Sequence, residues 1–149
     1  MKILFVCTGN TCRSPLAQAV LQQIIDRDNI AGIEVDSAGL CCGFGEPMSN
    51  HTSELIEEMG IFFTHTSQPV TQKLLEECSM VVTMTAAHKE MLAGFVDGGK
   101  LFSFEELSQE GEVADPYGGD SADYLAVEMQ LRRGMDKILE KAKKMIEEN

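Results

Sequence analysis

Cys7 and Arg13 are the residues whose types and spacing most directly suggest chemistry. A cysteine thiolate is a nucleophile, and an arginine guanidinium can bind two phosphoryl oxygens and stabilise the charge that spreads over them in a transition state. Cys-x5-Arg occurs often by chance, so its meaning depends on the elements beside it. Taken singly, Cys7 could be a buried strand cysteine and Arg13 a surface cation. The intervening loop and the next residue are Thr8, Gly9, Asn10, Thr11, Cys12 and Ser14.

The segment lies between a predicted strand and a predicted helix. Ile3–Val6 is a short apolar run, typical of a strand buried on both faces of a parallel sheet. Ser14 and Pro15 would begin the helix, with Ser14 as its N-cap. The loop between them can turn several N–H groups inward, aided by Gly9, and so form an oxyanion-binding nest at the positive end of the helix. In that field we expect Cys7 to be a thiolate at the floor of a phosphate-binding cup.

A thiolate that attacks a phosphate ester also needs an acid for the leaving group. Asp115 is the best candidate, because Pro116 stiffens its loop and Tyr117 then leads toward the last predicted helix. Asp115 would protonate the leaving atom and afterwards activate water against the phosphocysteine. An ordinary Asp-Pro turn is the alternative interpretation.

The remaining patterns predict the fold that must position these residues. Further strands are expected at Ile33–Val35, followed by a turn at Ser37–Gly39, at Val81–Met84 and at Leu101–Phe104. Apolar residues at helical spacing follow Pro15 and recur in three later segments, namely Leu55–Met59 closed by Gly60, Leu74–Cys78 capped by Thr71, and Leu131–Met145. Strands that alternate with helices predict an α/β three-layer sandwich with a parallel sheet, whose ligands bind beyond the carboxyl ends of the strands.

Length and charge limit the possible functions. The 149 residues predict one domain over 1–149, without linker or repeat. Twelve basic against 24 acidic residues give a net charge of −12, which argues against binding to nucleic acid or to an anionic membrane. No apolar run approaches a membrane span of about 20 residues, and the apolar stretch after Lys2 is too short for a signal peptide. A cytoplasmic protein is expected.

Cysteine usage agrees with that expectation. Five cysteines are an odd number, and a chain of this size needs none as cross-links, so reduced thiols are expected. Cys41, Cys42 and Cys78 show no zinc-ligand spacing with one another or with histidine, and no metal is expected.

The sequence resembles the low-molecular-weight protein tyrosine phosphatase family over essentially its whole length. The resemblance rests on the N-terminal Cys-x5-Arg-Ser-Pro, on Ser37–Gly39, on Val81–Met84 and on Asp115–Tyr117 before a terminal helix. It implies a four-stranded parallel sheet with flavodoxin-like strand order, a two-step mechanism through phosphocysteine, and no cofactor. It also implies a monomer that acts on phosphorylated protein substrates.

The same resemblance assigns roles to individual residues. Cys7 would be the nucleophile, Arg13 the phosphate clamp and Asp115 the general acid. Asn10 would brace the loop, Ser14 would stabilise the thiolate, and His65 would buttress both. Cys12 could trap an oxidised Cys7 as a reversible disulfide or could be a spectator thiol.

The substrate depends on Thr11. Tyrosine-specific members usually carry an apolar β-branched residue there, whereas bacterial protein arginine phosphatases of the family resemble this chain. A hydroxyl at the pocket wall suits a polar guanidinium better than a phenyl ring. Phosphoarginine is therefore the expected substrate and phosphotyrosine the alternative, since Tyr117 replaces the Phe expected in arginine phosphatases. Leu40 or Phe44 would supply a pocket wall, unless the pocket is more open.

Two other classes remain as rivals. An arsenate reductase uses the same fold but needs a relay of further cysteines, and no cysteine follows Cys78. A catalytically silent phospho-binding module would not need nucleophile, clamp and acid together. The resemblance also suggests an opposing protein arginine kinase as a partner.

Overall fold

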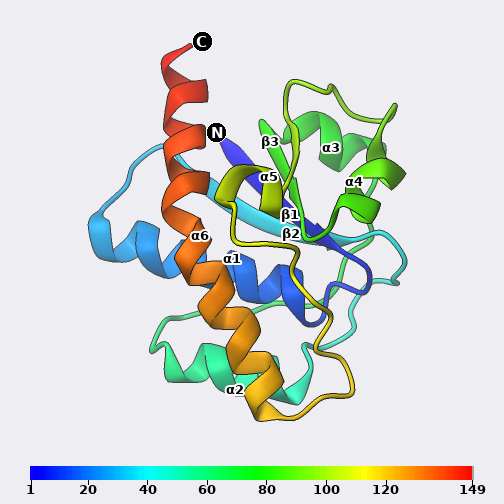
Figure 1. The fold of residues 1–149 in the computed structure, drawn as a ribbon, viewed down its shortest axis with the longest axis vertical. Coiled ribbons are helices and arrows are strands. Elements are labelled where there is room, and N and C mark those ends of the chain that lie inside the picture. The colour runs from blue at the N-terminus through cyan, green and yellow to red at the C-terminus, as the bar shows by residue number, and fades with distance from the viewer. Residues whose placement is uncertain (149) are drawn as a thin grey trace.

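A four-stranded parallel sheet lies at the centre of the molecule, with helices on both faces (Figure 1). The computed structural model describes residues 1–148. The sheet has the order β2-β1-β3-β4 and consists of β1 (Lys2–Cys7), β2 (Glu34–Gly39), β3 (Met80–Thr83) and β4 (Leu101–Ser103). This is the flavodoxin-like order, so the predicted α/β three-layer sandwich is confirmed.

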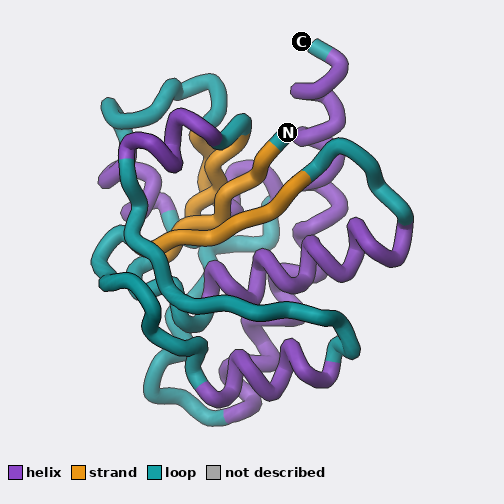
Figure 2. The backbone as a smooth tube through the Cα atoms, turned by 180° about the vertical axis from the view of Figure 1, so that it is seen from behind, coloured by secondary structure: helices purple, strands orange, loops and turns teal. Residues whose placement is uncertain are grey.

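The described part of the chain has six helices. Figure 2 shows the same layers from behind. The helices are α1 (Arg13–Asp28), α2 (Asn50–Glu58), α3 (Gln72–Glu77), α4 (Ala86–Leu92), α5 (Phe104–Ser108) and α6 (Ser121–Glu147). Of these, α2 packs on α1 and α6 rather than on the sheet. The predicted caps at Thr71 and Gly60 are confirmed: the Thr71 hydroxyl accepts from the amide of Leu74, and Gly60 follows α2 with a φ of 70°.

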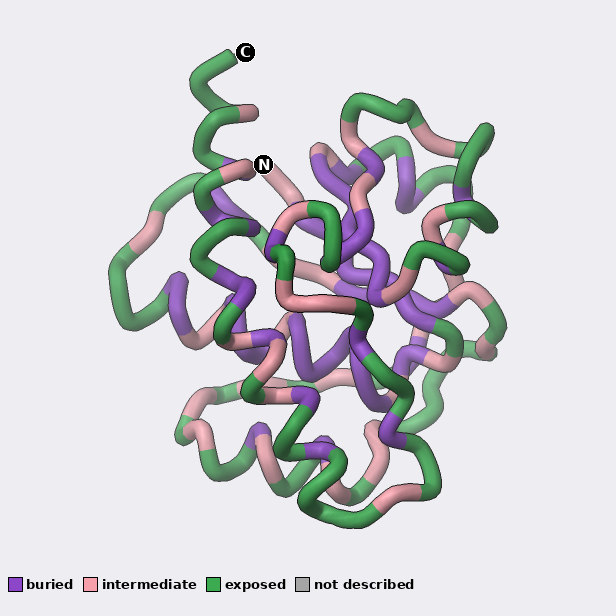
Figure 3. Tube along the Cα trace, in the orientation of Figure 1, coloured by how far each residue is buried: buried purple, intermediate pink, exposed green. Residues whose placement is uncertain are grey.

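The side chains of β1 alternate between two apolar clusters, one on each face of the sheet. Ile3 and Phe5 pack with α1 and α6, whereas Leu4 and Val6 pack with α3 and the end of α4. All four are fully buried, and the central strands β1 and β3 are buried along almost their whole length (Figure 3). Burial on both faces explains why β1 reads as a continuous apolar run in the sequence.

Two expected boundaries were wrong. Cys12, not Ser14, is the N-cap of α1, and Ser14 lies inside the first turn because its hydroxyl is held by Asn10 and Cys7. Ser37–Gly39 is not a turn but the end of β2, where Gly39 pairs with Cys7. Within residues 1–148, no helix combines the length and the apolar character that crossing a membrane would require.

Candidate active site

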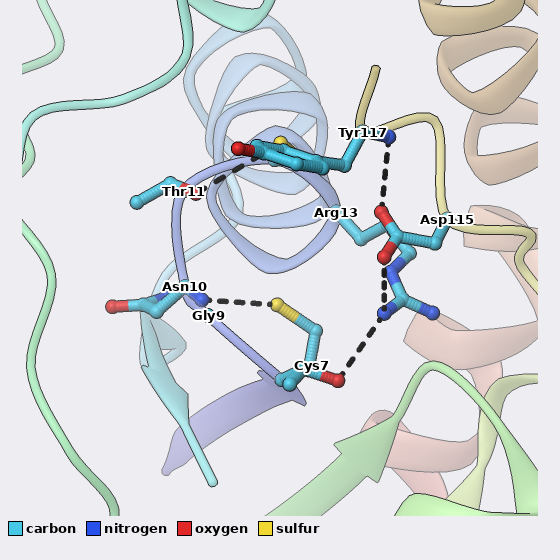
Figure 4. A pocket seen from close by; sticks show the side chains of 9 residues that line it. Cys7, Gly9, Asn10, Thr11, Arg13, Asp115 and Tyr117 are labelled. Atoms are coloured by element: carbon cyan, nitrogen blue, oxygen red, sulfur yellow. Dashed lines mark hydrogen bonds and ion pairs between the residues drawn. The ribbon is translucent and has the colours of Figure 1, made fainter. Parts of the chain in front are cut away.

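A pocket of about 210 Å³ lies beyond the carboxyl end of β1, between that strand and α1 (Figure 4). The 8–12 loop forms its base, and a second loop closes one side. Its lining residues are Cys7, Thr8, Gly9, Asn10, Thr11, Cys12, Arg13, Asp115 and Tyr117. The structure therefore brings together the expected nucleophile, phosphate clamp and general acid, although Asp115 is 108 positions from Cys7.

The Cys7 sulfur is buried and faces two hydrogen-bond donors. The backbone N–H of Asn10 lies 3.3 Å from it and the Ser14 hydroxyl oxygen 2.9 Å from it. The Ser14 oxygen accepts from the side-chain amide of Asn10 at 2.8 Å, which leaves its own proton free to point at the sulfur. Two donors aimed at one sulfur stabilise the thiolate form.

Asn10 holds the loop in shape from a position that is completely buried. Its φ of 57° lies in the left-handed region, which asparagine tolerates better than most residues. Its side-chain amide donates to Ser14 and to the Ser37 hydroxyl at 3.0 Å, and its side-chain oxygen accepts from the amide of Gln68 at 3.0 Å. The unusual backbone conformation is therefore fixed by contacts to three separate segments.

His65 supports Asn10 through the main chain. Its Nε2 lies 2.9 Å from the Asn10 carbonyl oxygen, which can only accept, so Nε2 carries the proton. Burial lowers the pKa of His65 below its ordinary value, and the bond to Asn10 partly opposes this. The resemblance implied contacts to Asn10 and Ser14 together, whereas the structure places His65 against the Asn10 backbone.

The rest of the loop presents free backbone donors. In the part of the chain that the structure describes, the N–H groups of Gly9, Thr11 and Cys12 have no acceptor within the protein. No side chain caps the start of α1 either. Such a set of free amides at a helix N-terminus is suited to binding an oxyanion.

The Arg13 guanidinium is held at the edge of this loop. It is buried, donates from Nη1 to the Val113 carbonyl at 3.1 Å and from Nη2 to the Thr8 hydroxyl at 3.4 Å, and lies 3.7 Å from the Asp115 carboxylate. These contacts come from both loops that line the pocket. Arginine is thereby oriented before a ligand arrives, as a clamp for phosphoryl oxygens requires.

Asp115 and Tyr117 enter from the second loop. The Tyr117 amide donates to the Asp115 carboxylate at 3.1 Å, so the turn itself orients the carboxyl group. The Asp115 side chain is 55% exposed and the Tyr117 residue is 80% exposed. Both can therefore reach a substrate that enters from solvent, and Figure 4 shows Asp115 on the side of the pocket opposite Asn10.

Of the other residues expected to determine specificity or redox behaviour, some line the pocket and others do not. Thr11 lines the pocket, but Leu40 does not, because it packs on the apolar cluster around Leu4 and Val6. Phe44 lines a separate hollow and is 75% exposed, so neither of the two expected wall residues lines the catalytic pocket. Cys12 lines the pocket, and its sulfur lies 3.5 Å from the buried Tyr124 hydroxyl.

Two of the cysteines outside the loop, Cys42 and Cys78, have raised pKa values. All five cysteines are free. Burial raises the pKa of Cys78 to about 11 and also raises that of Cys42, which disfavours their thiolates. Within residues 1–148, no group of three or more His, Cys, Asp or Glu side chains is placed to hold a metal ion.

Four residues that support the site were not among the expected ones. Ser37 and Gln68 bind the Asn10 side chain, and His88 binds Thr8. A Cβ atom on Gly39 would lie 2.7 Å from the Thr8 carbonyl oxygen, so only glycine fits beside the loop. The Ser37–Gly39 motif was a sequence signal for two of these four residues, Ser37 and Gly39.

Comparison with known proteins agrees with this geometry. Residues 2–148 match the family model described as low molecular weight phosphotyrosine protein phosphatase. The chain is 35% identical to a protein-arginine-phosphatase of Geobacillus stearothermophilus, covering 94% of this chain and 95% of that protein. It is 38% identical to the low molecular weight protein-tyrosine-phosphatase PtpB of Staphylococcus aureus, covering 84% and 87%.

Solved structures give the same result. A phosphorylated Cys-to-Ser variant of the YwlE arginine phosphatase superposes with a TM-score of 0.88 at 33% identity, over 97% of both chains. A low molecular weight protein tyrosine phosphatase from T. tengcongensis gives a TM-score of 0.87 at 34% identity, over 95% of this chain and 99% of that one. The chain belongs to the low molecular weight phosphotyrosine protein phosphatase family.

Proposed function

We propose that this protein is a cysteine-dependent protein phosphatase that hydrolyses phosphoarginine in phosphorylated proteins through a phosphocysteine intermediate. The observation that carries the chemistry is the arrangement of Cys7, Arg13 and Asp115 around one pocket at the start of α1. The observations that favour phosphoarginine are Thr11 in the pocket wall and two relatives that are named protein-arginine-phosphatases.

In the first step the phosphoryl group occupies the loop. Its oxygens accept from the free amides and from Arg13, and the Cys7 thiolate attacks phosphorus from the floor of the pocket. The S–P bond forms while the P–N bond of phosphoarginine breaks. Asp115 supplies a proton to the departing guanidine nitrogen.

In the second step the protein is regenerated. The Asp115 carboxylate accepts a proton from water, whose oxygen attacks the phosphocysteine. The S–P bond breaks, inorganic phosphate leaves and Cys7 returns as a thiolate. Ser14 and the Asn10 amide stabilise that thiolate as the leaving group, because both already point at the sulfur.

The pocket wall supports a polar substrate. The Thr11 hydroxyl lies 3.9 Å from the Cys12 sulfur, a weak contact that leaves its hydrogen-bonding capacity available. The exposed Asp115 carboxylate can accept from guanidine N–H groups, which a phenyl ring lacks. Two relatives with nearly full coverage, from Geobacillus stearothermophilus and Bacillus subtilis, are named protein-arginine-phosphatases.

Phosphotyrosine is the second candidate, and Tyr117 favours it. Its ring is exposed at the pocket mouth, where it can pack against a flat aromatic substrate. The Staphylococcus aureus relative named as a tyrosine phosphatase is also similar over most of the chain.

A direct comparison of rates separates these candidates. We would measure kcat/KM on two peptides of one sequence that carry either phosphoarginine or phosphotyrosine. A higher value on phosphoarginine is expected, and a higher value on phosphotyrosine would assign the second candidate. Cys7→Ser is the control, since it should bind inorganic phosphate but hydrolyse neither peptide. Wild-type binding without turnover of either peptide would indicate a silent module.

A further inference from the structure

His88 contacts the phosphate-binding loop from a helix that follows the neighbouring strand β3. It lies in α4, is 7% exposed, and its Nε2 is 2.9 Å from the Thr8 hydroxyl oxygen, although the two residues are 80 positions apart. The Thr85 hydroxyl caps α4 by accepting from the His88 amide, which fixes the turn that carries the imidazole. The ring therefore enters the loop from a rigid element.

Thr8 connects His88 to the Arg13 guanidinium by a second hydrogen bond. Its hydroxyl oxygen also accepts from Nη2 of Arg13 at 3.4 Å, and Thr8 lines the pocket. A hydroxyl rotates freely unless its partners fix it, and His88 is the second partner that does so. The chain of contacts runs from His88 through Thr8 to the guanidinium.

The imidazole makes no other polar contact with its ring in the described structure. Its Nδ1 is buried and has no hydrogen-bond partner there. Because Nδ1 has no partner, the contact between Nε2 and the Thr8 hydroxyl is the polar interaction that sets the ring orientation. The buried Nδ1 has an energetic cost, which the fold tolerates in that orientation. Burial and the charge of Arg13 lower the pKa of His88, while the carboxylates of Asp115 and Glu112 oppose this. A neutral ring suits its place behind a cationic clamp.

We propose that His88 is a positioning residue, whose Nε2 orients the Thr8 hydroxyl so that it holds the Arg13 guanidinium in place for phosphoryl oxygens. This proposal rests on the proposed function, because it assigns a role within the same site. It gives α4, which has no side chain in the pocket, a defined effect on catalysis.

Three His88 variants and a thermodynamic cycle test it. His88→Phe keeps a buried ring without nitrogen, and His88→Asn has an amide too short to reach Thr8. Both should lower kcat by about tenfold, with a smaller change in KM, since the clamp acts most strongly in the transition state. His88→Gln can reach Thr8 and should recover most of the loss. Loss in all three variants alike, or in none, would overturn the proposal.

The cycle separates positioning from simple packing. If His88 acts through Thr8, the double variant with Thr8→Val and His88→Phe should lose no more kcat than Thr8→Val alone. Multiplied losses would show that His88 acts on the site by another route. Should His88→Phe fail to fold, the Asn and Gln pair gives the same comparison.

Phosphate binding distinguishes failure of the positioning role of His88 from failure of the proposed function. Calorimetric titration with inorganic phosphate reports the clamp without any turnover. If wild-type protein hydrolysed neither peptide, the proposed function would fail, yet equal losses of phosphate affinity in His88→Phe, Thr8→Val and the double variant would still support the positioning role. Unchanged phosphate affinity together with unchanged kcat in His88→Phe would reject it.

Discussion

The backbone N–H of Asn10 points at the sulfur of Cys7 across 3.3 Å, and it does so because Asn10 adopts a left-handed φ of 57°. The side chain of Asn10 stabilises that conformation by bonding to Ser14, Ser37 and Gln68. The nucleophile is thus oriented by a residue that contributes a backbone atom to the site and a side chain to the framework. Asn10 should therefore contribute both to the stability of the fold and to the activity.

Replacement of Asn10 should therefore lower the stability of the fold as well as the activity. Asn10→Ala removes three side-chain hydrogen bonds and should lower the free energy of unfolding by about 3 kcal/mol. Asn10→Gly removes the same bonds but accepts the left-handed conformation, so it should be about 1 kcal/mol more stable than Asn10→Ala. Urea denaturation measures both values. Equal stabilities of the two variants would show that the backbone conformation carries no strain.

Gly39 provides a separate test of the loop position. A Cβ atom there would lie 2.6 Å from the Cys42 sulfur and 2.7 Å from the Thr8 carbonyl oxygen, so Gly39→Ala must displace the loop. We expect kcat/KM to fall by more than about tenfold, since small displacements of catalytic groups are costly. Gly43→Ala is the matched control, because its Cβ would meet nothing within 4 Å. Similar losses in both variants would contradict a specific role for the Gly39 contact.

Substrate preference should depend on the polarity of Thr11. Thr11→Val keeps the shape of the side chain and removes the hydroxyl, whereas Thr11→Ile also adds bulk. Both should lower the ratio of kcat/KM on phosphoarginine to that on phosphotyrosine, by about tenfold for a lost polar contact. If only Thr11→Ile changes the ratio, volume rather than polarity selects the substrate. An unchanged ratio in both variants would refute the role of Thr11.

The buried histidines predict how stability changes with pH. The pKa values of His65 and His88 are lowered in the folded protein from the ordinary 6.5, mainly by burial. As pH falls from about 7 to about 5.5, these two side chains bind more protons in the unfolded chain than in the folded protein. The free energy of unfolding should therefore fall over that interval. A variant with Gln at both positions should lose less stability over that interval. An identical loss, measured by urea denaturation at both pH values, would contradict the lowered pKa values.

The central strands and the long helices could be predicted because their burial is local and periodic. β1 appears as an apolar run and α6 as an amphipathic repeat. The short helices α4 and α5 were missed, whereas the six-residue α3 was predicted from its adjacent leucines and its Thr71 cap. One of the two buried positions of α4 is the polar His88, and α5 has only five residues, so neither shows an apolar repeat. The Ser14 cap was wrong because the residue is a good N-cap locally but is bound by Asn10 in the folded loop.

The catalytic candidates were visible in the sequence for a different reason. Cys7 and Arg13 flank one continuous loop, so their spacing, together with the strand before the loop and the helix start after it, indicates phosphate chemistry. The supporting residues are invisible at that level, because Ser37, Gln68 and His88 contact the loop from 27, 58 and 80 positions away. The parallel sheet brings two of those segments to the loop, because β2, which carries Ser37, and β3, which leads to His88, pair with β1 on either side.

The proposed covalent role of Cys7 can be tested most directly by trapping the intermediate. A Cys12→Ser protein, in which Cys7 is the one loop thiol, would be quenched with acid during turnover of a phosphoarginine peptide and mapped by mass spectrometry. The mechanism predicts phosphate attached to the Cys7 sulfur, and none when unphosphorylated peptide is used. Continued turnover with Cys7 free of phosphate, or phosphate on a different side chain, would contradict it.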